Sequence, residues 1–503
     1  MKYIQITLLL LMSFTLEAQT SRYVSKTSSP LSPFTSWSTA SRTISDCLLI
    51  CNFGDTVYVG EGVFEEVLTM PPGVIIIGSG IDRTILDPTY VVTSSKAVIN
   101  LYADVSVHHL TIKPNLNLPA LEPFARISWE PNITVDISNI KAENFNTGIY
   151  FFRAQGKIVD CIFSVLTGSV LGAYGIDSIS GHIYVENNVL TQKGNSYSFT
   201  HGNLIFRNNL VIAQQAYSAI KLFDIGSSGK YQRFYNNVFI SISDNITSYT
   251  LMEDGGQKSK FHNNLFITNR IGISQNQLHN SRKSEYTNNI FMGCRIGFRP
   301  YQPGLYKYNN HYKNTQSVSF QYTVIDTTNN FTLNPMFVDF ANQDYHLQKY
   351  SPLIDLGDTN ILDLDGTVSD IGIYGGPYGS LYDYINLPPS ANISLKAKVV
   401  EGDFILNWLK NEEVDVMGYR IYSDTMPGVQ LLPENLLYEV TASLDSIKDT
   451  TAFQSEKRYY TLTAIDLEGL ESEKGNEVMI GLTSIDDVEN FELSGYKLYQ
   501  NYP

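Results

Sequence analysis

Six Asn-Asn pairs between residues 187 and 310 constrain the fold of this 503-residue chain more than any other feature. The pairs begin at positions 187, 208, 236, 263, 288 and 309, so successive pairs lie 21, 28, 27, 25 and 21 residues apart. A phrase that returns at this spacing indicates one supersecondary unit stacked on itself. We therefore expect a solenoid over this part of the chain.

Apolar residues alternate with polar ones on both sides of the pairs, which is the period of a β-strand. Two positions before the first Asn stand Val185, Phe206, Phe234, Phe261 and Tyr286. Two positions after it stand Val189, Leu210, Val238, Leu265 and Ile290, each followed by a further apolar residue. Strands stacked at about 4.8 Å in a right-handed parallel β-helix explain this pattern. Asn suits the bend because it tolerates the left-handed backbone region, and its amides can form ladders. We therefore interpret the pairs as scaffold, not as catalytic groups.

Less regular coils extend the series towards the N-terminus. Ser138-Asn139 and Asp160-Cys161 fall at bend positions, and His108-His109 is interpreted as an earlier bend, not as a metal site. Ahead of these coils, Ala40, Ile44, Leu48 and Cys51 recur at helical spacing after the candidate caps Ser36 and Ser38. Such a helix would cover the unpaired edge of the first coil.

Several phrases identify the fold family. They are Gly54-Asp55-Thr56-Val57, the Asn-Asn coils, Asn334-Pro335-Met336-Phe337 and Asp370-Ile371-Gly372-Ile373. With them, residues 22 to about 380 resemble the pectate-lyase-like right-handed β-helix superfamily of secreted bacterial proteins. The superfamily includes lyases, hydrolases, epimerases and binding proteins, so the resemblance implies a fold and not a reaction. We assign 19–380 to an all-β parallel β-helix.

A second domain follows a Pro-rich linker at 381–390. Residues 391–483 contain short alternating strands, and Trp408 with Gly418-Tyr419-Arg420-Ile421-Tyr422 resembles a fibronectin type III domain. The resemblance implies a β-sandwich in which Trp408 belongs to the core, not to a sugar-stacking platform. It also implies that Tyr460 is the corner tyrosine, bonded to the backbone.

The two ends of the chain predict export. Residues 1–18 have the form of a signal peptide, with Lys2, the apolar run Leu8 to Met12, and Ala18 before the cut. No later stretch is apolar enough to cross a bilayer. Within 484–503, the closing Gln500-Asn501-Tyr502-Pro503 resembles the start of the sorting domain of type IX secretion cargo. That resemblance implies the type IX machinery as a partner, and a secreted or cell-surface location in a Gram-negative, Bacteroidetes-like bacterium.

Charge and cysteine content bear on the partners of the protein and on its disulfide bonding. A formal net charge of -15 disfavours nucleic acid as a partner. Cys47 and Cys51 lie one helical turn apart, where they either pair or remain two buried thiols, and the sparse cysteine content favours thiols. Nothing in the sequence calls for a second subunit, and we expect a monomer.

Basic residues precede the Asn pairs and form the candidate site. The candidates for binding an acidic polysaccharide are Lys230, Arg233, Lys258, Lys260 and Lys283. Arg233 and Lys260 stand three positions before their Asn pairs and should stack. Glu253 and Asp254 are candidates for holding a cation, with Ca²⁺ possible. The alternative is that these lysines and arginines only solvate the outer face.

A lyase reaction is the enzymatic version of this hypothesis, with Lys258, Lys260 or Arg282 as candidate catalytic groups. Lyase chemistry is favoured over glycoside hydrolysis. Residues 251–261 are similar to the catalytic coil of the chondroitinase-B and alginate-lyase family. That family continues with Arg-His-Gly, whereas this chain has Gly272-Ile273-Ser274-Gln275, which leaves the base unassigned. The rival hypothesis is a non-catalytic adhesin or structural surface protein. Asp363-Leu364-Asp365-Gly366 suggests either a Ca²⁺ loop or a cap on the last coil, and we favour the cap.

Overall fold

The computed structural model describes residues 19–481 with short gaps. The gaps are 89–96, 102–103, 114–124, 128–132, 146–147, 153, 166–170, 175–181, 193–196, 201–202, 215–217, 224–230, 243–247, 255–257, 277–283, 303, 321–322, 402 and 453–456. The expected signal peptide at 1–18 and sorting-domain start at 484–503 therefore lie outside the described residues. In the part that is described, every helix is too short or too polar to span a membrane.

The chain divides into two compact units. The first is Met1–Leu333 with Asp355–Leu381, and the second is Asn334–Ile354 with Tyr382–Pro503. The second unit thus includes a segment, 334–354, that precedes the last piece of the first unit in sequence.

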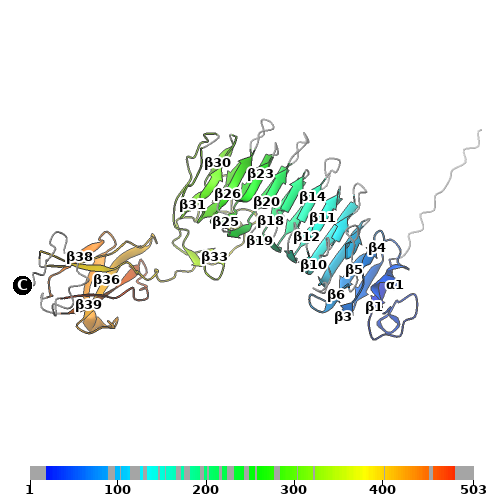
Figure 1. Cartoon of the computed structure of the whole chain (residues 1–503), viewed down its shortest axis with the longest axis horizontal. Helices are drawn as coiled ribbons and strands as arrows, with labels where there is room; N and C mark the ends of the chain where they lie inside the picture. The colour runs from blue at the N-terminus through cyan, green and yellow to red at the C-terminus, as the bar shows by residue number, and fades with distance from the viewer. Residues whose placement is uncertain are drawn as a thin grey trace, which may run out of the picture. The chain divides into compact units, whose positions relative to one another are not determined.

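The first unit is the predicted right-handed parallel β-helix, which is confirmed: its coils contribute strands to three parallel ladders (Figure 1). The first ladder contains β1 (Ser21–Val24), β2 (Thr56–Val59), β5 (Ile75–Gly78), β8 (Val105–Ile112), β10 (Ile133–Phe145), β12 (Ala154–Val159), β15 (His182–Glu186), β18 (Asn203–Arg207), β21 (Tyr231–Tyr235), β24 (Lys258–His262), β27 (Glu285–Thr287) and β30 (Leu305–Lys307).

The other two ladders complete each coil. After the bend, the second ladder contains β3 (Gly62–Phe64), β6 (Thr84–Leu86), the later halves of β8 and β10, β13 (Ile162–Val165), β16 (Val189–Gln192), β19 (Leu210–Gln214), β22 (Val238–Ile242), β25 (Leu265–Thr268), β28 (Ile290–Met292) and β31 (Asn310–Tyr312). The third contains β4 (Leu68–Met70), β7 (Ile99–Leu101), β9 (Ala125–Ile127), β11 (Ile149–Phe152), β14 (Leu171–Tyr174), β17 (Tyr197–Thr200), β20 (Ser218–Phe223), β23 (Tyr249–Asp254), β26 (Ile271–Asn276) and β29 (Ile296–Arg299).

The two residues of each Asn pair have different tasks. The first, such as Asn208 with φ of 55°, adopts the left-handed conformation that turns the first ladder into the second. The second, such as Asn209, is buried and links three coils. Its Nδ2 donates to the Val185 carbonyl of the preceding coil at 2.8 Å and to Asn237 Oδ1 of the next coil at 3.0 Å. This amide ladder runs from Asn188 to Asn330 with the same pattern in each coil.

The sixth pair is one residue out of the predicted register. Tyr308 takes the left-handed bend position with φ of 59°, so Asn309, and not Asn310, enters the amide ladder. A seventh pair, Asn329-Asn330, restores the pattern, because Asn329 has φ of 57° and Asn330 accepts from Asn309. The early bends are confirmed: His109, Asn139 and Asp160 all have positive φ.

The predicted apolar columns are in register and form the core. Phe206, Phe234, Phe261 and Tyr286 are successive strand partners, and the rings of Phe234 and Phe261 stack at 4.8 Å. A second column, from Phe239 through Phe266 to Phe291, stacks in the same way after the bend. Each coil therefore packs its apolar side chains against side chains of the same kind in the next coil. This packing buries apolar surface area and places the aromatic rings in a favourable stacked geometry.

A short helix covers part of the N-terminal end of the solenoid. Helix α1 (Ile44–Leu48) buries Ile44, Cys47 and Leu48, and its cap is Thr43, not Ser36 or Ser38. Ser36 instead caps the 3₁₀ turn η1 (Trp37–Thr39). All four cysteines are free thiols; Cys47 is buried in α1, whereas Cys51 lies beyond the helix and is only partly buried, unlike the predicted pair of buried thiols.

The second unit contains a β-sandwich. One antiparallel sheet has β34 (Lys396–Val400), β35 (Asp403–Asn407) and β38 (Ser446–Asp449). The other has β37 (Leu436–Thr441), β36 (Val416–Asp424), β39 (Arg458–Asp466) and β40 (Val478–Ile480). A hairpin of β32 (Phe337–Asp339) and β33 (Asp344–Leu347) and the turn η3 (Pro433–Asn435) complete the described elements. The assignment to the fibronectin type III family remains a prediction.

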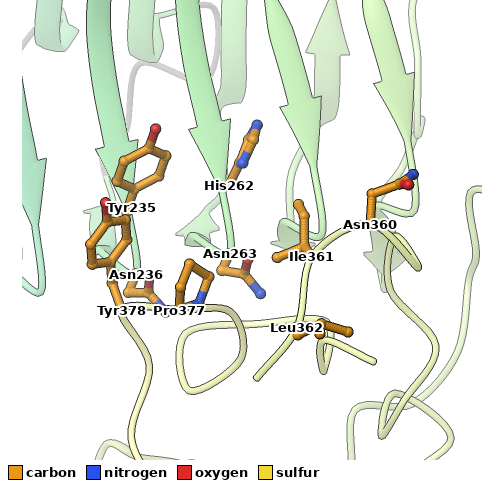
Figure 2. Close-up of a pocket in the computed structure, with 9 residues that line it drawn as sticks. All are labelled: Tyr235, Asn236, His262, Asn263, Asn360, Ile361, Leu362, Pro377 and Tyr378. Carbon is orange, nitrogen blue, oxygen red and sulfur yellow. The ribbon is translucent and has the colours of Figure 1, made fainter. Parts of the chain in front are cut away.

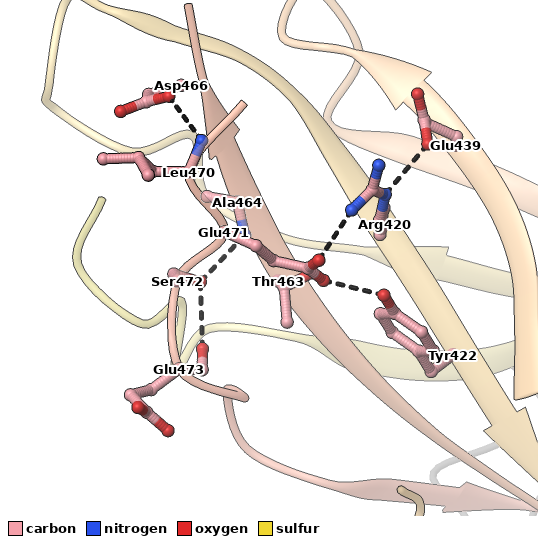
Figure 3. A network of polar contacts seen from close by, with 10 residues as sticks. All are labelled: Arg420, Tyr422, Glu439, Thr463, Ala464, Asp466, Leu470, Glu471, Ser472 and Glu473. Atoms are coloured by element: carbon pink, nitrogen blue, oxygen red, sulfur yellow. Dashed lines mark hydrogen bonds and ion pairs between the residues drawn. The ribbon is translucent and has the colours of Figure 1, made fainter. Parts of the chain in front are cut away.

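Buried groups fix the sandwich. Trp408 lies in its core, as expected, with its ring against Tyr419 at 5.4 Å. The expectation for Tyr460 was wrong: its hydroxyl donates to the Asp449 carboxylate at 2.7 Å and not to the backbone. Glu471 joins β36 to β39, because it accepts hydrogen bonds from Arg420, Tyr422 and Thr463 (Figure 3).

Candidate functional site

The outer face of the first ladder carries the polar side chains that alternate with the core. Arg233 and Lys260 are direct strand partners, so the predicted stacking of their positions is confirmed. The basic residues are interleaved with acids. Lys260 Nζ lies 2.7 Å from Glu285 Oε2, and Arg207 Nη2 lies 2.9 Å from Glu186 Oε2. The face is therefore a band of alternating charge and not an uninterrupted basic stripe.

Of the other predicted site residues that the structure describes, Glu253 and Asp254 lie on β23 of the third ladder and not on this face. Glu253, a candidate for holding a cation, is 3% exposed and points into the solenoid. Its carboxylate accepts hydrogen bonds from Ser284 Oγ at 2.7 Å, from Gln275 Nε2 at 3.2 Å and from the Tyr286 hydroxyl. Burial and this carboxylate raise the pKa of Tyr286 well above its ordinary value. Three donors satisfy Glu253 inside the core, so it does not serve an external cation.

Asp254 is half-buried at the end of β23, and Asn276 is its strand partner. Lys230, Arg282 and Lys283 lie outside the described residues, as does the side chain of Lys258. Among the residues that are described, no group of three or more His, Cys, Asp or Glu side chains is placed to hold a metal ion. The Ca²⁺ expectation thus has no support at Glu253.

A segment near the end of the first unit lies across the bends of the solenoid, and we call Asp355–Leu381 the strap. Asn263 Nδ2 donates to the carbonyls of Asp370 at 2.8 Å and Gly372 at 3.1 Å. One coil earlier, Asn236 Nδ2 donates to the carbonyls of the strap residues 373 and 375. The first residues of the Asn pairs therefore hold the strap as well as turning the chain.

The strap does not cap the last coil, contrary to the expectation for residues 363–366. Its hydrogen bonds reach the bends of three earlier coils, because Asn288 Oδ1 also accepts from the Asp358 backbone at 2.9 Å. Asp363 serves the strap itself by accepting from the Asp370 backbone at 3.0 Å and from the Gly376 backbone. Burial raises the pKa of Asp363.

The strap and the outer face enclose a pocket of about 450 Å³. Figure 2 shows Tyr235, Asn236, His262 and Asn263 on the side of the solenoid and residues 360–362, 377 and 378 on the side of the strap. The rings of Tyr235 and Tyr378 stack at 5.0 Å between centroids. The Arg207 guanidinium lies 4.9 Å from the Tyr378 ring centroid and extends this stack. Such a volume lies within the range of about 300–1,000 Å³ that is typical of small-molecule sites.

Two titratable groups of the pocket, His262 and Tyr235, are uncharged at neutral pH. Burial, and then the charge of Lys260, lower the pKa of His262 to about 4. Its Nε2 lies 3.9 Å from Glu285 Oε2, beyond hydrogen-bond distance. Burial raises the pKa of Tyr235 to about 12. The solenoid wall thus combines an aromatic face with a neutral imidazole, a phenol and amide groups.

The sequence analysis did not single out Tyr235 or His262. Both stand immediately before the first Asn of their pairs and are strand partners, so the same alignment that exposed Arg233 and Lys260 could have found them. The strap had no comparable signal, because its residues have no place in the repeat.

Comparison with known proteins adds little to this geometry. No protein-family model and no curated protein matches the chain. Among solved structures, pectate lyase Pel9A is 12% identical, with a TM-score of 0.36 over 71% of this chain and 97% of its own. The A-module of mannuronan C-5 epimerase AlgE4 from Azotobacter vinelandii is 12% identical, with a TM-score of 0.31 over 57% and 93%.

The spore cortex lytic enzyme SleM of Clostridium perfringens is 21% identical over 22% of this chain, with a TM-score of 0.16, and the chain spans about a third (32%) of that enzyme. Likenesses this distant carry no information on activity. The fold rests on the strand register described above.

Proposed function

We propose that this protein binds a polysaccharide on the outer face of the first ladder, with one sugar unit seated in the pocket between Tyr235 and the strap. The observation that carries the proposal is the composition of that pocket. Sugar rings have apolar C–H faces and polar rims, and the pocket offers the stacked rings of Tyr235 and Tyr378 beside the amide-bearing bends. A concave site with aromatic walls and a few polar groups is the usual form of a ligand site.

The charges beside the pocket support an acidic polymer. Arg233 and Lys260 occupy adjacent coils on the same face, about one strand spacing apart. Lys260 forms an ion pair with Glu285, so we expect an anionic polymer to compete with the Glu285 carboxylate for the Lys260 ammonium group. Binding at exposed charges weakens as salt screens them. A preference for uronate-containing polymers, with marked salt dependence, is therefore the specific form of the proposal.

The experiment measures affinity of the full chain for alginate, polygalacturonate, hyaluronate and a neutral glucan by affinity electrophoresis and calorimetry. Tyr235→Ala with Tyr378→Ala should abolish retention of the preferred polymer. Tyr58→Ala, on the same ladder near the N-terminal end, is the matched control. Equal retention by the double variant and by wild type would refute the location of the site.

A second pair of variants tests the acidic preference. Arg233→Gln with Lys260→Gln should weaken binding to uronate polymers and reduce its dependence on salt, since two cations leave the face. Lys157→Gln is the control, because Lys157 is an exposed residue on the outer face of the same ladder. If the double variant retains the salt dependence of wild type, the basic residues only solvate the surface.

The same samples separate a lyase from a non-catalytic adhesin. β-Elimination of a uronate creates an unsaturated product that absorbs in the ultraviolet. Glu253, one of the two acidic residues expected to hold Ca²⁺ beside a uronate, is buried away from the outer face, which favours the adhesin. New absorbance with any of the three uronate polymers and Ca²⁺ would refute the non-catalytic version.

We further propose that the protein is exported by the type IX route to the cell surface or medium. Support comes from the signal-like residues 1–18 and the closing Gln500-Asn501-Tyr502-Pro503. Mass spectrometry of the cell-surface and medium fractions of the native bacterium should find chains that begin after Ala18. Chains that retain Met1 and stay inside the cell would refute export.

A further inference from the structure

A buried carboxylate without a partner lies at one end of the sandwich. Asp415 is 2% exposed and immediately precedes β36. Neither of its side-chain oxygens has a hydrogen-bond partner among the described residues. Burying an ionised carboxylate without compensation is costly, so this group calls for a ligand or a proton.

A second buried carboxylate lies beside it. Val416, the residue after Asp415, is the strand partner of Asp466 at the end of β39, and Asp466 is fully buried. Asp466 Oδ1 accepts from the Leu470 backbone at 2.8 Å, which fixes the turn that follows β39 (Figure 3). The register thus brings Asp415 and Asp466 to the same end of two neighbouring strands.

An amide oxygen completes the group. Asn386 Nδ2 donates to Asp466 Oδ2 at 2.7 Å and to Glu468 Oε2 at 3.2 Å. The Oδ1 atom of the same amide is buried and, like the Asp415 carboxylate, has no partner in the part of the chain that the structure describes. Three side-chain oxygens without donors therefore belong to one small region around Asp466.

The local charge is strongly negative. Burial raises the pKa of Asp415, and the charges of Asp466, Glu413 and Glu468 raise it further. Lys349 is a cation in this region, and its Nζ is bound to Glu468 Oε1 at 2.5 Å. Its charge is therefore committed to Glu468 and not to the two buried aspartates.

We propose that Asp415, Asp466 and the Asn386 amide oxygen bind a Ca²⁺ ion. The set consists of oxygen donors alone, which suits Ca²⁺ and not Zn²⁺. Two carboxylates balance the charge of the ion. Ca²⁺ accepts six to eight oxygens in irregular geometry, so backbone carbonyls and water complete its shell, whereas Mg²⁺ demands a near-ideal octahedron. The ion would join the segment that contains Asn386 to the sandwich.

The test compares Ca²⁺ with a proton as the partner of Asp415. The full chain is stripped with EDTA and titrated with CaCl₂ by calorimetry, while hydrogen exchange of β36 and β39 reports the stability of the sandwich. At 100 times the dissociation constant, Ca²⁺ should raise the melting midpoint of this unit by roughly 10 °C. Under the same conditions MgCl₂ should bind at least tenfold more weakly.

The variant Asp415→Asn keeps the shape and removes the charge. It should lose the response to Ca²⁺, yet in EDTA it should be at least as stable as wild type. The reason is that a raised carboxyl pKa means the ionised form destabilises the fold at neutral pH. Asp403→Asn is the control, because Asp403 is about half exposed and paired with Lys448.

Two results would overturn the proposal. The first is a wild-type chain with no heat of Ca²⁺ binding and no shift in exchange, but with greater stability as pH falls from 7 to 5, which would assign a proton to Asp415. The second is an undiminished Ca²⁺ response in Asp415→Asn, which would place the ion elsewhere.

Discussion

Replacing one Asn of a pair at a time separates the bend from the amide ladder. Asn208 and Asn209 are adjacent in the same coil, but Asn208 is exposed in the left-handed conformation and Asn209 is 2% exposed. Asn209→Ala should therefore remove hydrogen bonds, whereas Asn208→Ala should remove only a favourable bend residue. Asn208→Gly, which tolerates the left-handed conformation, is the baseline.

The magnitudes follow from the contacts. The Asn209 side chain donates to Val185 O at 2.8 Å and to Asn237 Oδ1 at 3.0 Å. It accepts from the Asn188 backbone at 3.0 Å and from Asn188 Nδ2 at 2.9 Å. At about 1 kcal/mol for each of these buried hydrogen bonds, Asn209→Ala should destabilise its coil by about 4 kcal/mol. Asn208→Ala should cost about 1–2 kcal/mol, the price of a left-handed Ala.

Hydrogen–deuterium exchange is the suitable assay, because a solenoid opens locally and its unfolding need not be two-state. A loss of about 4 kcal/mol corresponds to about a thousandfold faster exchange through local opening, at about 1.4 kcal/mol per tenfold. The effect should centre on β16, β19 and β22 and leave β36 unchanged. If Asn209→Ala accelerates exchange no more than Asn208→Ala, the amide ladder is not what holds the coils.

Three further predictions concern the strap, the pocket and the sandwich. Asn263→Ala removes the side-chain hydrogen bonds to Ser369, Asp370 and Gly372. Hydrogen exchange in the strap should therefore become faster while β24 stays protected. An unchanged exchange rate in the strap would contradict the anchoring role of Asn263. The folded-state pKa of His262 is about 4, against about 6.5 in an unfolded chain. Between pH 6.5 and 4 only the unfolded state takes up this proton, so the stability of the fold falls on acidification through that window. His262→Gln should flatten the fall of the thermal midpoint there, and the same slope as wild type would disprove the assignment. Tyr460→Phe leaves the buried Asp449 carboxylate without one donor and should cost about 2 kcal/mol in urea unfolding of the sandwich, with Tyr459→Phe as the neutral control.

The fold could be predicted because the repeated Asn pairs show which residues of successive coils are equivalent. Once the coils are aligned on the Asn pairs, the residues two positions before them must face the same way, and Phe234 and Phe261 do so. The predicted register is wrong at Asn309-Asn310, because Tyr308 takes the bend position there and identical residue letters do not guarantee the same backbone conformation.

The site was predictable only where it belongs to the first ladder. Arg233 and Lys260 follow from the alignment, whereas Glu253 was misjudged because the third ladder has no Asn marker to show which residues face inward. Charged side chains are usually excluded from protein cores, but three hydrogen-bond donors offset the burial of Glu253. The strap could not be predicted from the sequence, because its contacts join residues 70 to 139 positions apart and follow no sequence period.

The strap has a consequence for the timing of assembly. Neighbouring coils of a solenoid can form one after another as the chain becomes available, since each needs only the coil before it. The pocket cannot, because its two walls are separated by about a hundred residues of chain that must fold or pass by first. A partly emerged chain can thus have every coil up to His262 in place and still lack one wall of the proposed sugar site. The proposed site is therefore completed only after the coils between His262 and the strap have formed.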